Sequence, residues 1–137
     1  MTSSSDSLRE LIDDEAASIN RDRLLTLLKP YVRFNSSGSL NFLPQFGKLD
    51  GRAKVQIILA ASKARSLLMP DKYPDGLIPK EILDLETMPV GTGKSAIKDL
   101  SDTHKIRKDE TSGRYIIPNF LIDELADRLA SNSKKHE

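Results

Sequence analysis

The 137-residue sequence contains no cysteine and no tryptophan, and aromatic residues make up only 5% of it. A chain without cysteine can form no disulfide, no thiolate metal site and no cysteine nucleophile. The two histidines, His104 and His136, lie far apart and have no partner at metal-ligand spacing, so we expect no metal site. Because aromatic side chains are scarce, the core must consist of leucine, isoleucine, alanine and valine.

The sequence also lacks a marked excess of charge and a long apolar run. Its 21 basic and 20 acidic residues give a formal net charge of +1, so any basic surface for nucleic acid must be local. No apolar run reaches the roughly 18 residues that a membrane span requires. The first six residues, MTSSSD, have neither the basic nor the apolar region of a signal peptide. We therefore expect a cytoplasmic protein that does not contact a membrane.

The length suits one compact domain with an appendage, and the N-terminal part carries signals of its own. Residues 6–19 and 20–29 both have apolar residues at helical spacing, and a proline follows the second run. Two β-prone runs, 31–34 and 40–43, flank four turn-forming residues and predict a β-hairpin. These elements together form a predicted N-terminal module, residues 1–48.

The strongest helical pattern covers residues 51–68, follows a connector at 44–49 and can be capped by Asp50. Its apolar residues lie on more than one side, which predicts a central core helix. After a loop rich in proline and glycine, Pro79 is suited to the first position of a second helix, residues 79–87, because that position needs no backbone N–H.

A turn at Pro89 and Gly91 separates this helix from the next one, residues 92–104. We expect Thr92 to be the N-cap of that helix, since its hydroxyl can accept a hydrogen bond from a free backbone N–H. The helical spacing turns three apolar residues inward, Ala96, Ile97 and Leu100, and leaves the following polar residues outside: Lys94, Ser95, Lys98, Asp99 and Asp102.

Two short strands, 105–108 and 114–117, and a final amphipathic helix, 119–130, complete the pattern. We expect the apolar side of the final helix to contain Phe120, Leu121, Leu125 and Leu129. The second predicted domain therefore covers residues 49–131 and is followed by a polar tail, 132–137. The predicted fold class is α+β, mainly α.

One short motif looks like part of a nucleotide-binding loop. Gly93, Lys94 and Ser95 match the end of the pattern GxxxxGK[ST], whose backbone N–H groups surround a phosphate. The first glycine of that pattern is replaced by Met88, and the preceding segment alternates charged and apolar residues instead of forming a buried strand. A turn followed by a helix is favoured here, and a nucleotide-binding enzyme that uses the degenerate loop Gly91–Ser95 is the least favoured alternative.

The order of three helices, a hairpin and a last helix from residue 51 to residue 130 resembles the winged helix-turn-helix superfamily of small DNA-binding transcriptional regulators. The resemblance covers about two-thirds of the chain and is carried mainly by the turn at 89–92, the helical run 95–100 and the strand sequences KIRK and RYII. It implies that the second helix of the pair enters a major groove and that the hairpin, the wing, contacts the flanking backbone.

The resemblance implies a non-catalytic protein that binds double-stranded DNA and needs no cofactor. The predicted nucleic-acid-binding residues are those with hydroxyl or basic side chains on the second helix and the wing: Thr92, Lys94, Ser95, Lys98, Lys105, Arg107, Lys108 and Arg114. Strand alternation is expected to divide the basic residues of the wing between its two faces.

Two further predictions concern partners. Residues 80–104 contain three lysines against five acidic residues, and this negative balance leaves open a winged helix that binds another protein within a larger assembly. The amphipathic terminal segments, 6–29 and 119–130, could bury their apolar faces within the fold or across a two-fold axis, which predicts a homodimer.

Overall fold

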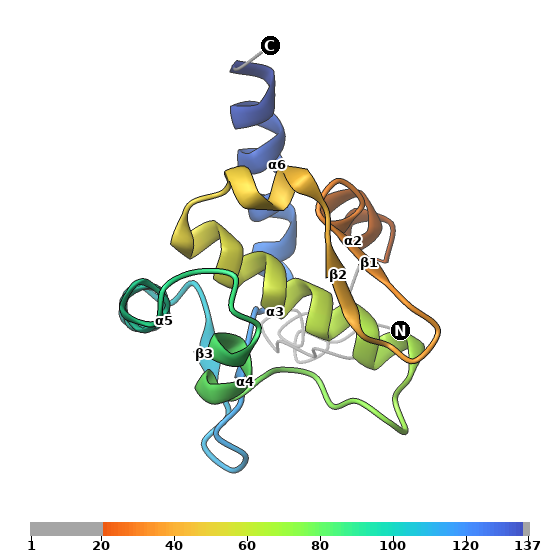
Figure 1. The fold of residues 1–137 in the computed structure, drawn as a ribbon, viewed down its shortest axis with the longest axis vertical. Coiled ribbons are helices and arrows are strands. Elements are labelled where there is room, and N and C mark those ends of the chain that lie inside the picture. The colour runs from red at the N-terminus through yellow and green to blue at the C-terminus, as the bar shows by residue number, and fades with distance from the viewer. Residues whose placement is uncertain (1–20, 136–137) are drawn as a thin grey trace, which may run out of the picture.

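The structure, a computed structural model, describes residues 21–135, with side chains described as far as residue 131. It is mainly helical with two small antiparallel hairpins, so the α+β, mainly α class is confirmed (Figure 1). The elements in chain order are α2 (Arg21–Leu28), β1 (Val32–Phe34), β2 (Leu40–Phe42), the 3-10 helix η2 (Pro44–Lys48), α3 (Gly51–Leu68), α4 (Pro79–Asp84), α5 (Val90–Asp102), β3 (Arg107–Lys108), β4 (Tyr115–Ile116) and α6 (Asn119–Lys135). The helix predicted within residues 6–19 lies outside the described residues.

Helix α3 runs through the middle of the molecule, as predicted (Figure 1). The Asp50 carboxylate caps it, because Oδ1 accepts a hydrogen bond of 2.8 Å from the backbone N–H of Ala53. Side chains on several sides of the helix are buried, and those of Ile57, Ile58 and Leu59 are completely inaccessible to solvent. The other helices therefore pack around α3.

The hairpin β1–β2 has the predicted strands, with Val32 opposite Phe42, and it packs on α3 and the loop after it. Arg65 Nη1 donates to the Gly38 carbonyl at 3.2 Å, and the Tyr73 hydroxyl donates to the Ser37 carbonyl at 2.8 Å. Both bonds fix the turn of the hairpin. The N-terminal module is thus attached directly to the central helix.

The predicted connector after the hairpin is instead the 3-10 helix η2. Its side chain Phe46 is buried and stacks on Phe42 with a ring-centroid distance of 4.3 Å. Pro44 at the start of η2 is compatible with a helical turn, and burial of the Phe46 ring stabilises that turn. Five residues are too few to show a helical period, so the sequence does not indicate this turn.

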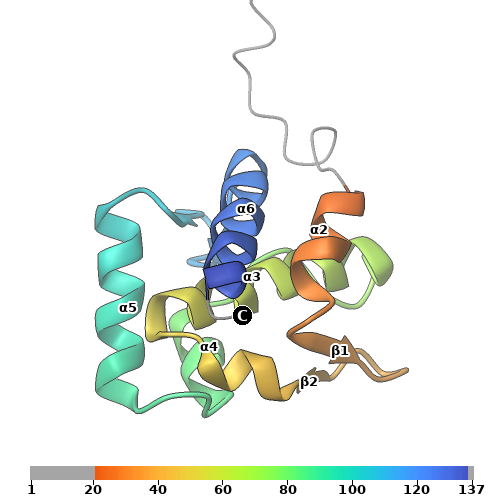
Figure 2. The ribbon, with the colours of Figure 1, turned by 90° about the horizontal axis from the view of Figure 1, so that it is seen from above.

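Helix α2 packs against α6, so elements from both ends of the described chain meet (Figure 2). The Arg23 guanidinium forms ion pairs with Asp123 at 2.9 Å and with Asp127 at 2.7 Å. Beneath this pair, Leu24, Leu27 and Leu28 of α2 belong to the same buried cluster as the core residues of α3 and α6. Residues on both sides of position 48 therefore share one core.

The second hairpin pairs β3 with β4, and a single bridge extends it. Arg107 lies opposite Ile116, and Leu77, which precedes α4, pairs with Tyr115 through reciprocal backbone hydrogen bonds of 2.8 and 3.0 Å. The strands are shorter than the predicted 105–108 and 114–117. The backbone N–H groups of residues 105 and 106 bond to the Leu100 carbonyl, so these residues complete the end of α5 instead of the ladder.

Helix α5 begins earlier than predicted, and Thr92 is not its N-cap. The backbone N–H of Gly93 donates to the Pro89 carbonyl at 2.9 Å, so the first helical turn already contains Val90 and Gly91. Pro89 occupies the capping position and offers no side-chain hydrogen bond. Val90 and Gly91 can both adopt helical backbone angles, so the helix begins at Val90 and not at Thr92.

The last helix also departs from its predicted pattern. Phe120, expected on the buried side, is 66% exposed, and Ile122 is buried in its place. Leu121, Leu125 and Leu129 are buried as predicted, so the buried face differs from the predicted one only at its edge, where Ile122 replaces Phe120. The helix continues to Lys135, into the predicted polar tail.

Candidate nucleic-acid interface

Helix α5 is fixed against α3 and α4 by its apolar face. Ala96, Ile97 and Leu100 are buried, as predicted, and the helix approaches its neighbours closely at Gly93. A Cβ atom at Gly93 would lie 2.5 Å from Leu83 Cδ2. This packing determines which side of α5 faces solvent.

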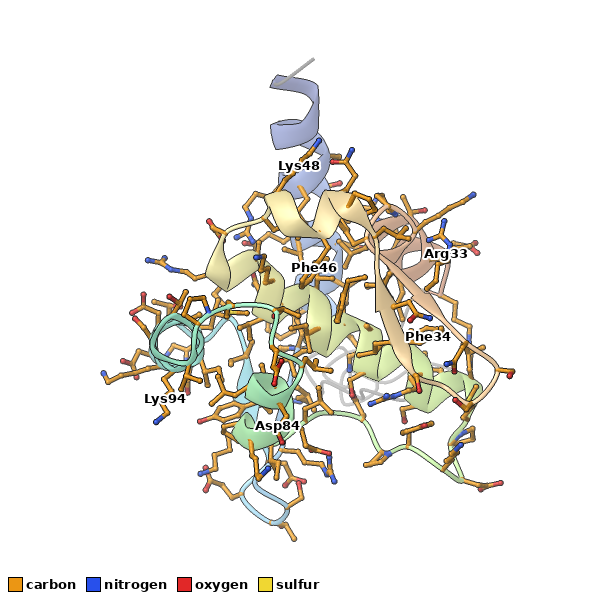
Figure 3. All side chains as sticks on the ribbon, in the orientation of Figure 1. Arg33, Phe34, Phe46, Lys48, Asp84 and Lys94 are labelled. Atoms are coloured by element: carbon orange, nitrogen blue, oxygen red, sulfur yellow. The ribbon has the colours of Figure 1, made fainter. Side chains whose placement is uncertain are left out.

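The opposite face of α5 carries the four helical residues predicted to contact nucleic acid. Thr92, Lys94, Ser95 and Lys98 are all exposed, and they lie on one helix within two turns of each other. Figure 3 shows the Lys94 side chain pointing away from the body of the protein. A helix of this length, about 20 Å, fits along a major groove.

Acidic side chains on the same face offset part of its charge. Lys98 Nζ lies 3.0 Å from Asp102 Oδ2, and this hydrogen bond together with the Asp102 charge raises the pKa of Lys98. Asp99 pairs with Arg52 of α3 at 3.1 Å. Two lysines against two aspartates make the exposed face of α5 neutral by itself, and Arg52 adds one cation to it.

Arg52 is the one basic residue at this face that the sequence analysis missed. It belongs to the first turn of α3, about 40 positions before α5 in the sequence, so only the packing of α3 on α5 brings it there. Together with Thr92 and Ser95 it lines a polar groove between the two helices. A second groove on the other flank of α5 is lined by Lys94, Lys98 and Tyr115, among others.

The hairpin β3–β4 contributes two exposed basic residues, Arg107 and Lys108, next to each other on one strand. The other two predicted residues of the wing are engaged inside the fold. Lys105 Nζ pairs with Glu124 of α6 at 3.0 Å, and Arg114, half-buried, pairs with Glu81 of α4 at 3.0 Å. Lys105 and Arg114 are thus committed to ion pairs with other helices, whereas the side chains of Arg107 and Lys108 are exposed.

The turn of the hairpin is acidic and well ordered by its own hydrogen bonds. The Asp109 carboxylate accepts bonds from the Ser112 hydroxyl at 2.8 Å and from the backbone N–H of Thr111 at 3.1 Å. These two bonds, the first one above all, lower the pKa of Asp109. With Glu110 beside it, the turn balances the charges of Arg107 and Lys108.

The residues of the apparent nucleotide-binding motif, Gly91–Ser95, are helical and follow α4 and its turn instead of a strand. They form no curled loop of backbone N–H groups of the kind that surrounds a phosphate. Within residues 21–135 no group of three acidic or histidine side chains could hold a metal ion. None of the helices in this range is long and apolar enough to cross a membrane.

Comparison with known proteins adds no family. No family model matches the sequence, and no curated protein and no solved structure is significantly similar to it.

Proposed function

We propose that the protein is a winged helix-turn-helix protein that binds double-stranded DNA without catalysis, with α5 as the recognition helix and the β3–β4 hairpin as the wing. The observation that supports this most directly is the order of the strand segments. Leu77 pairs with β4, and β4 pairs with β3. The segment that comes last in the chain, β4, therefore lies between the other two. Between the first and second segments the chain inserts α4 and α5.

This arrangement leaves α5 with one free polar face beside an exposed hairpin, as a recognition helix and its wing require. Lys94 and Ser95 are exposed on the helix, where they can reach phosphates or base edges, and Lys108 is exposed on the hairpin, where it can reach the backbone. The hydroxyl of Thr92 and the first N–H groups of α5 can approach a phosphate at the positive end of the helix.

The balance of charge on both elements predicts weak binding that depends strongly on salt. Each phosphate contact made by a basic side chain contributes about 0.9 to the slope of log affinity against log salt for duplex DNA. With few uncompensated cations, we expect measurable affinity at low salt and little at physiological salt.

The test is fluorescence anisotropy of a mixed-sequence duplex titrated with protein at several salt concentrations. Replacing Lys94 and Lys108 together by alanine should weaken binding about tenfold at low salt and reduce the salt slope by about 2. The matched control replaces Lys29 and Lys48, two exposed lysines remote from α5, and should leave both values close to those of the native protein. Equal losses in the two double variants, or no binding at low salt, would contradict the proposal.

A second function is favoured by the same charge balance. Because the α5 face and the hairpin are each close to neutral, the unit could recognise another protein instead of a duplex. Absence of DNA binding at every salt concentration would favour this alternative. The proposed cytoplasmic location is common to both functions.

The homodimer through the terminal segments remains a prediction. Within one chain, α2 already packs its buried leucines against α6, so the interface would have to use other side chains, such as the exposed ring of Phe120. Light scattering at micromolar concentration should give twice the chain mass if the dimer forms. A mass of one chain would exclude it at that concentration.

A further inference from the structure

Helix α2 and strand β1 lie on the side of the molecule remote from α5 (Figures 1 and 2). An apolar groove lies between these two elements and the C-terminal half of α3. Its volume is about 380 Å³, and its apolar lining includes Leu24, Leu25, Leu28, Val32, Phe34 and Leu68. Leu25 and Leu68 are 62% and 63% exposed. Two leucines exposed next to a concave apolar surface favour an apolar occupant.

The rim of this groove is basic. Arg21, Lys29 and Arg33 are among the lining residues, and no acidic residue is. Arg33 Nη1 donates hydrogen bonds to the carbonyls of Lys29 and Val32, which holds the guanidinium at the C-terminal end of α2. Figure 3 shows Arg33 and Phe34 on the same hairpin strand, at this side of the molecule. The occupant that fits is an apolar helix face bordered by acidic side chains.

The chain itself contains a segment with these properties immediately before α2. Residues 6–19 carry Leu8, Leu11, Ile12, Ala16 and Ile19 at helical spacing. The same residues include five acidic side chains and one arginine, a net charge of −4. Only Asn20 separates the segment from Arg21, which lines the groove.

The connection also allows the segment to return along α2. Two antiparallel helices can be joined by a loop of two to five residues, which residues 17–20 provide. A helix from residue 6 to residue 16 would be about 16 Å long, somewhat longer than α2 at about 12 Å. An antiparallel course brings Asp6 and Glu10 towards Lys29 and Arg33, at the far end of α2, and leaves Asp13 and Asp14 nearer to Arg21.

We propose that residues 6–19 fold back onto the groove of their own chain, with residues 6–16 as an amphipathic helix antiparallel to α2 that makes apolar contacts to Leu25 and Leu68 and turns acidic side chains towards the basic rim at Arg21, Lys29 and Arg33. This contact does not depend on DNA binding, because α5 lies on the other side of α3 and α6 (Figure 2).

The test is a double-mutant cycle in the full-length chain, followed by urea unfolding. Ile12→Gln and Leu68→Gln are neutral substitutions that keep good helix propensity, so they remove only the apolar contact. Each should lower the urea midpoint, and the double variant should lie no lower than the worse single variant. The control is Val90→Gln, since Val90 is 56% exposed but outside the groove, and its midpoint should be unchanged.

Two results would overturn the proposal. If Leu68→Gln behaves like Val90→Gln, or if the effects of Ile12→Gln and Leu68→Gln simply add, residues 6–19 do not occupy the groove. If the two substitutions are coupled but the midpoint rises with protein concentration and light scattering gives a dimer, the occupant is the segment of a second copy. A coupled, concentration-independent midpoint is the result that supports binding within one chain.

Discussion

His104 ends α5 with a positive φ of 61°, in the left-handed region of backbone space. Its backbone N–H donates to the Ser101 carbonyl at 3.2 Å, and that of Lys105 donates to the Leu100 carbonyl at 2.8 Å. This pair of bonds is the Schellman arrangement, in which the left-handed position is most often glycine because it has no Cβ. A histidine side chain at this position carries a steric cost of about 1–2 kcal/mol.

We therefore predict that His104→Gly raises the free energy of unfolding by about 0.5–1 kcal/mol, since the relief of strain exceeds the entropy that glycine gains in the unfolded chain. Urea unfolding measures the change. His104→Ala is the control, because alanine keeps a Cβ and should bring no gain. Equal stabilisation by both substitutions would show that φ is not the cause.

A second residue-scale prediction concerns pH. The pKa of Asp109 is lowered in the folded chain, chiefly by the hydrogen bond from the Ser112 hydroxyl. The carboxylate therefore contributes stability that is present above the unfolded pKa and is lost as the pH falls through the folded pKa. We expect an NMR titration of the Asp109 carboxyl to give a pKa below the ordinary aspartate value and Ser112→Ala to raise it. An unchanged pKa in that variant would rule out the hydroxyl as the cause.

At the scale of elements, Gly76 determines how the strand segment before α4 meets the hairpin. It has φ of 94°, and a Cβ atom there would lie 2.7 Å from the Tyr115 carbonyl oxygen. Its N–H donates to the buried Ser62 hydroxyl at 3.1 Å, so the backbone cannot move away without losing that bond. Gly113, by contrast, has φ of 76° and open space around its Cα.

Gly76→Ala should therefore lower the free energy of unfolding by about 2–4 kcal/mol, because strain at positive φ is added to a backbone clash. Gly113→Ala, the matched control, should cost only the strain, about 1–2 kcal/mol. Urea unfolding of both variants gives the difference. Similar losses in the two variants would mean that the contact with Tyr115 does not constrain Gly76.

The sequence predicted the elements better than their ends. Asp50 and Pro79 were identified correctly because capping and proline geometry act over a few neighbouring residues. The start of α5 was wrong by two residues, since a good N-cap at Thr92 does not prevent Val90 and Gly91 from being helical. Phe120 was misplaced because the phase of a helix is set by what it packs against, which a periodic pattern determines only to within about one residue.

At the scale of the whole molecule, residues before and after position 48 belong to one hydrophobic cluster. Phe46 is 3% exposed, stacks on Phe42 and lies beneath Lys54 of α3, whose ammonium is 5.8 Å from the ring centroid. The hairpin β1–β2 and the central helix should therefore unfold together and not as separate domains.

Phe46→Ala should lower the free energy of unfolding by about 3–5 kcal/mol, because it leaves a large cavity in that shared core. Far-UV circular dichroism follows the helices, and tyrosine fluorescence follows Tyr31 of the N-terminal part as well as Tyr73 and Tyr115. Both signals should shift by the same amount. Two separate transitions would instead support an independent module at residues 1–48.

The candidate interface was predictable only in part, because some of its residues are positioned by contacts between elements that are distant in sequence. The exposed residues of α5 follow from helical spacing within one element, so Lys94 and Ser95 were placed correctly on the outer face. Contacts between elements that are distant in sequence pair Lys105 and Arg114 with acidic residues of other helices. Such a contact also places Arg52 beside Asp99. Composition and periodicity carry no information about such contacts.

The Glu81 carboxylate joins the β3–β4 hairpin to the first turn of α4. Its Oε1 accepts the Ile78 N–H at 3.0 Å, which caps the helix, and also Arg114 Nη1 at 3.0 Å, while the same guanidinium nitrogen reaches the Gly76 carbonyl at 3.1 Å. The hairpin is therefore tied to α4 by a side-chain contact as well as by the Leu77–Tyr115 bridge. Loss of the Glu81 carboxylate should loosen the start of α4 and the hairpin together, because both depend on the same acceptor.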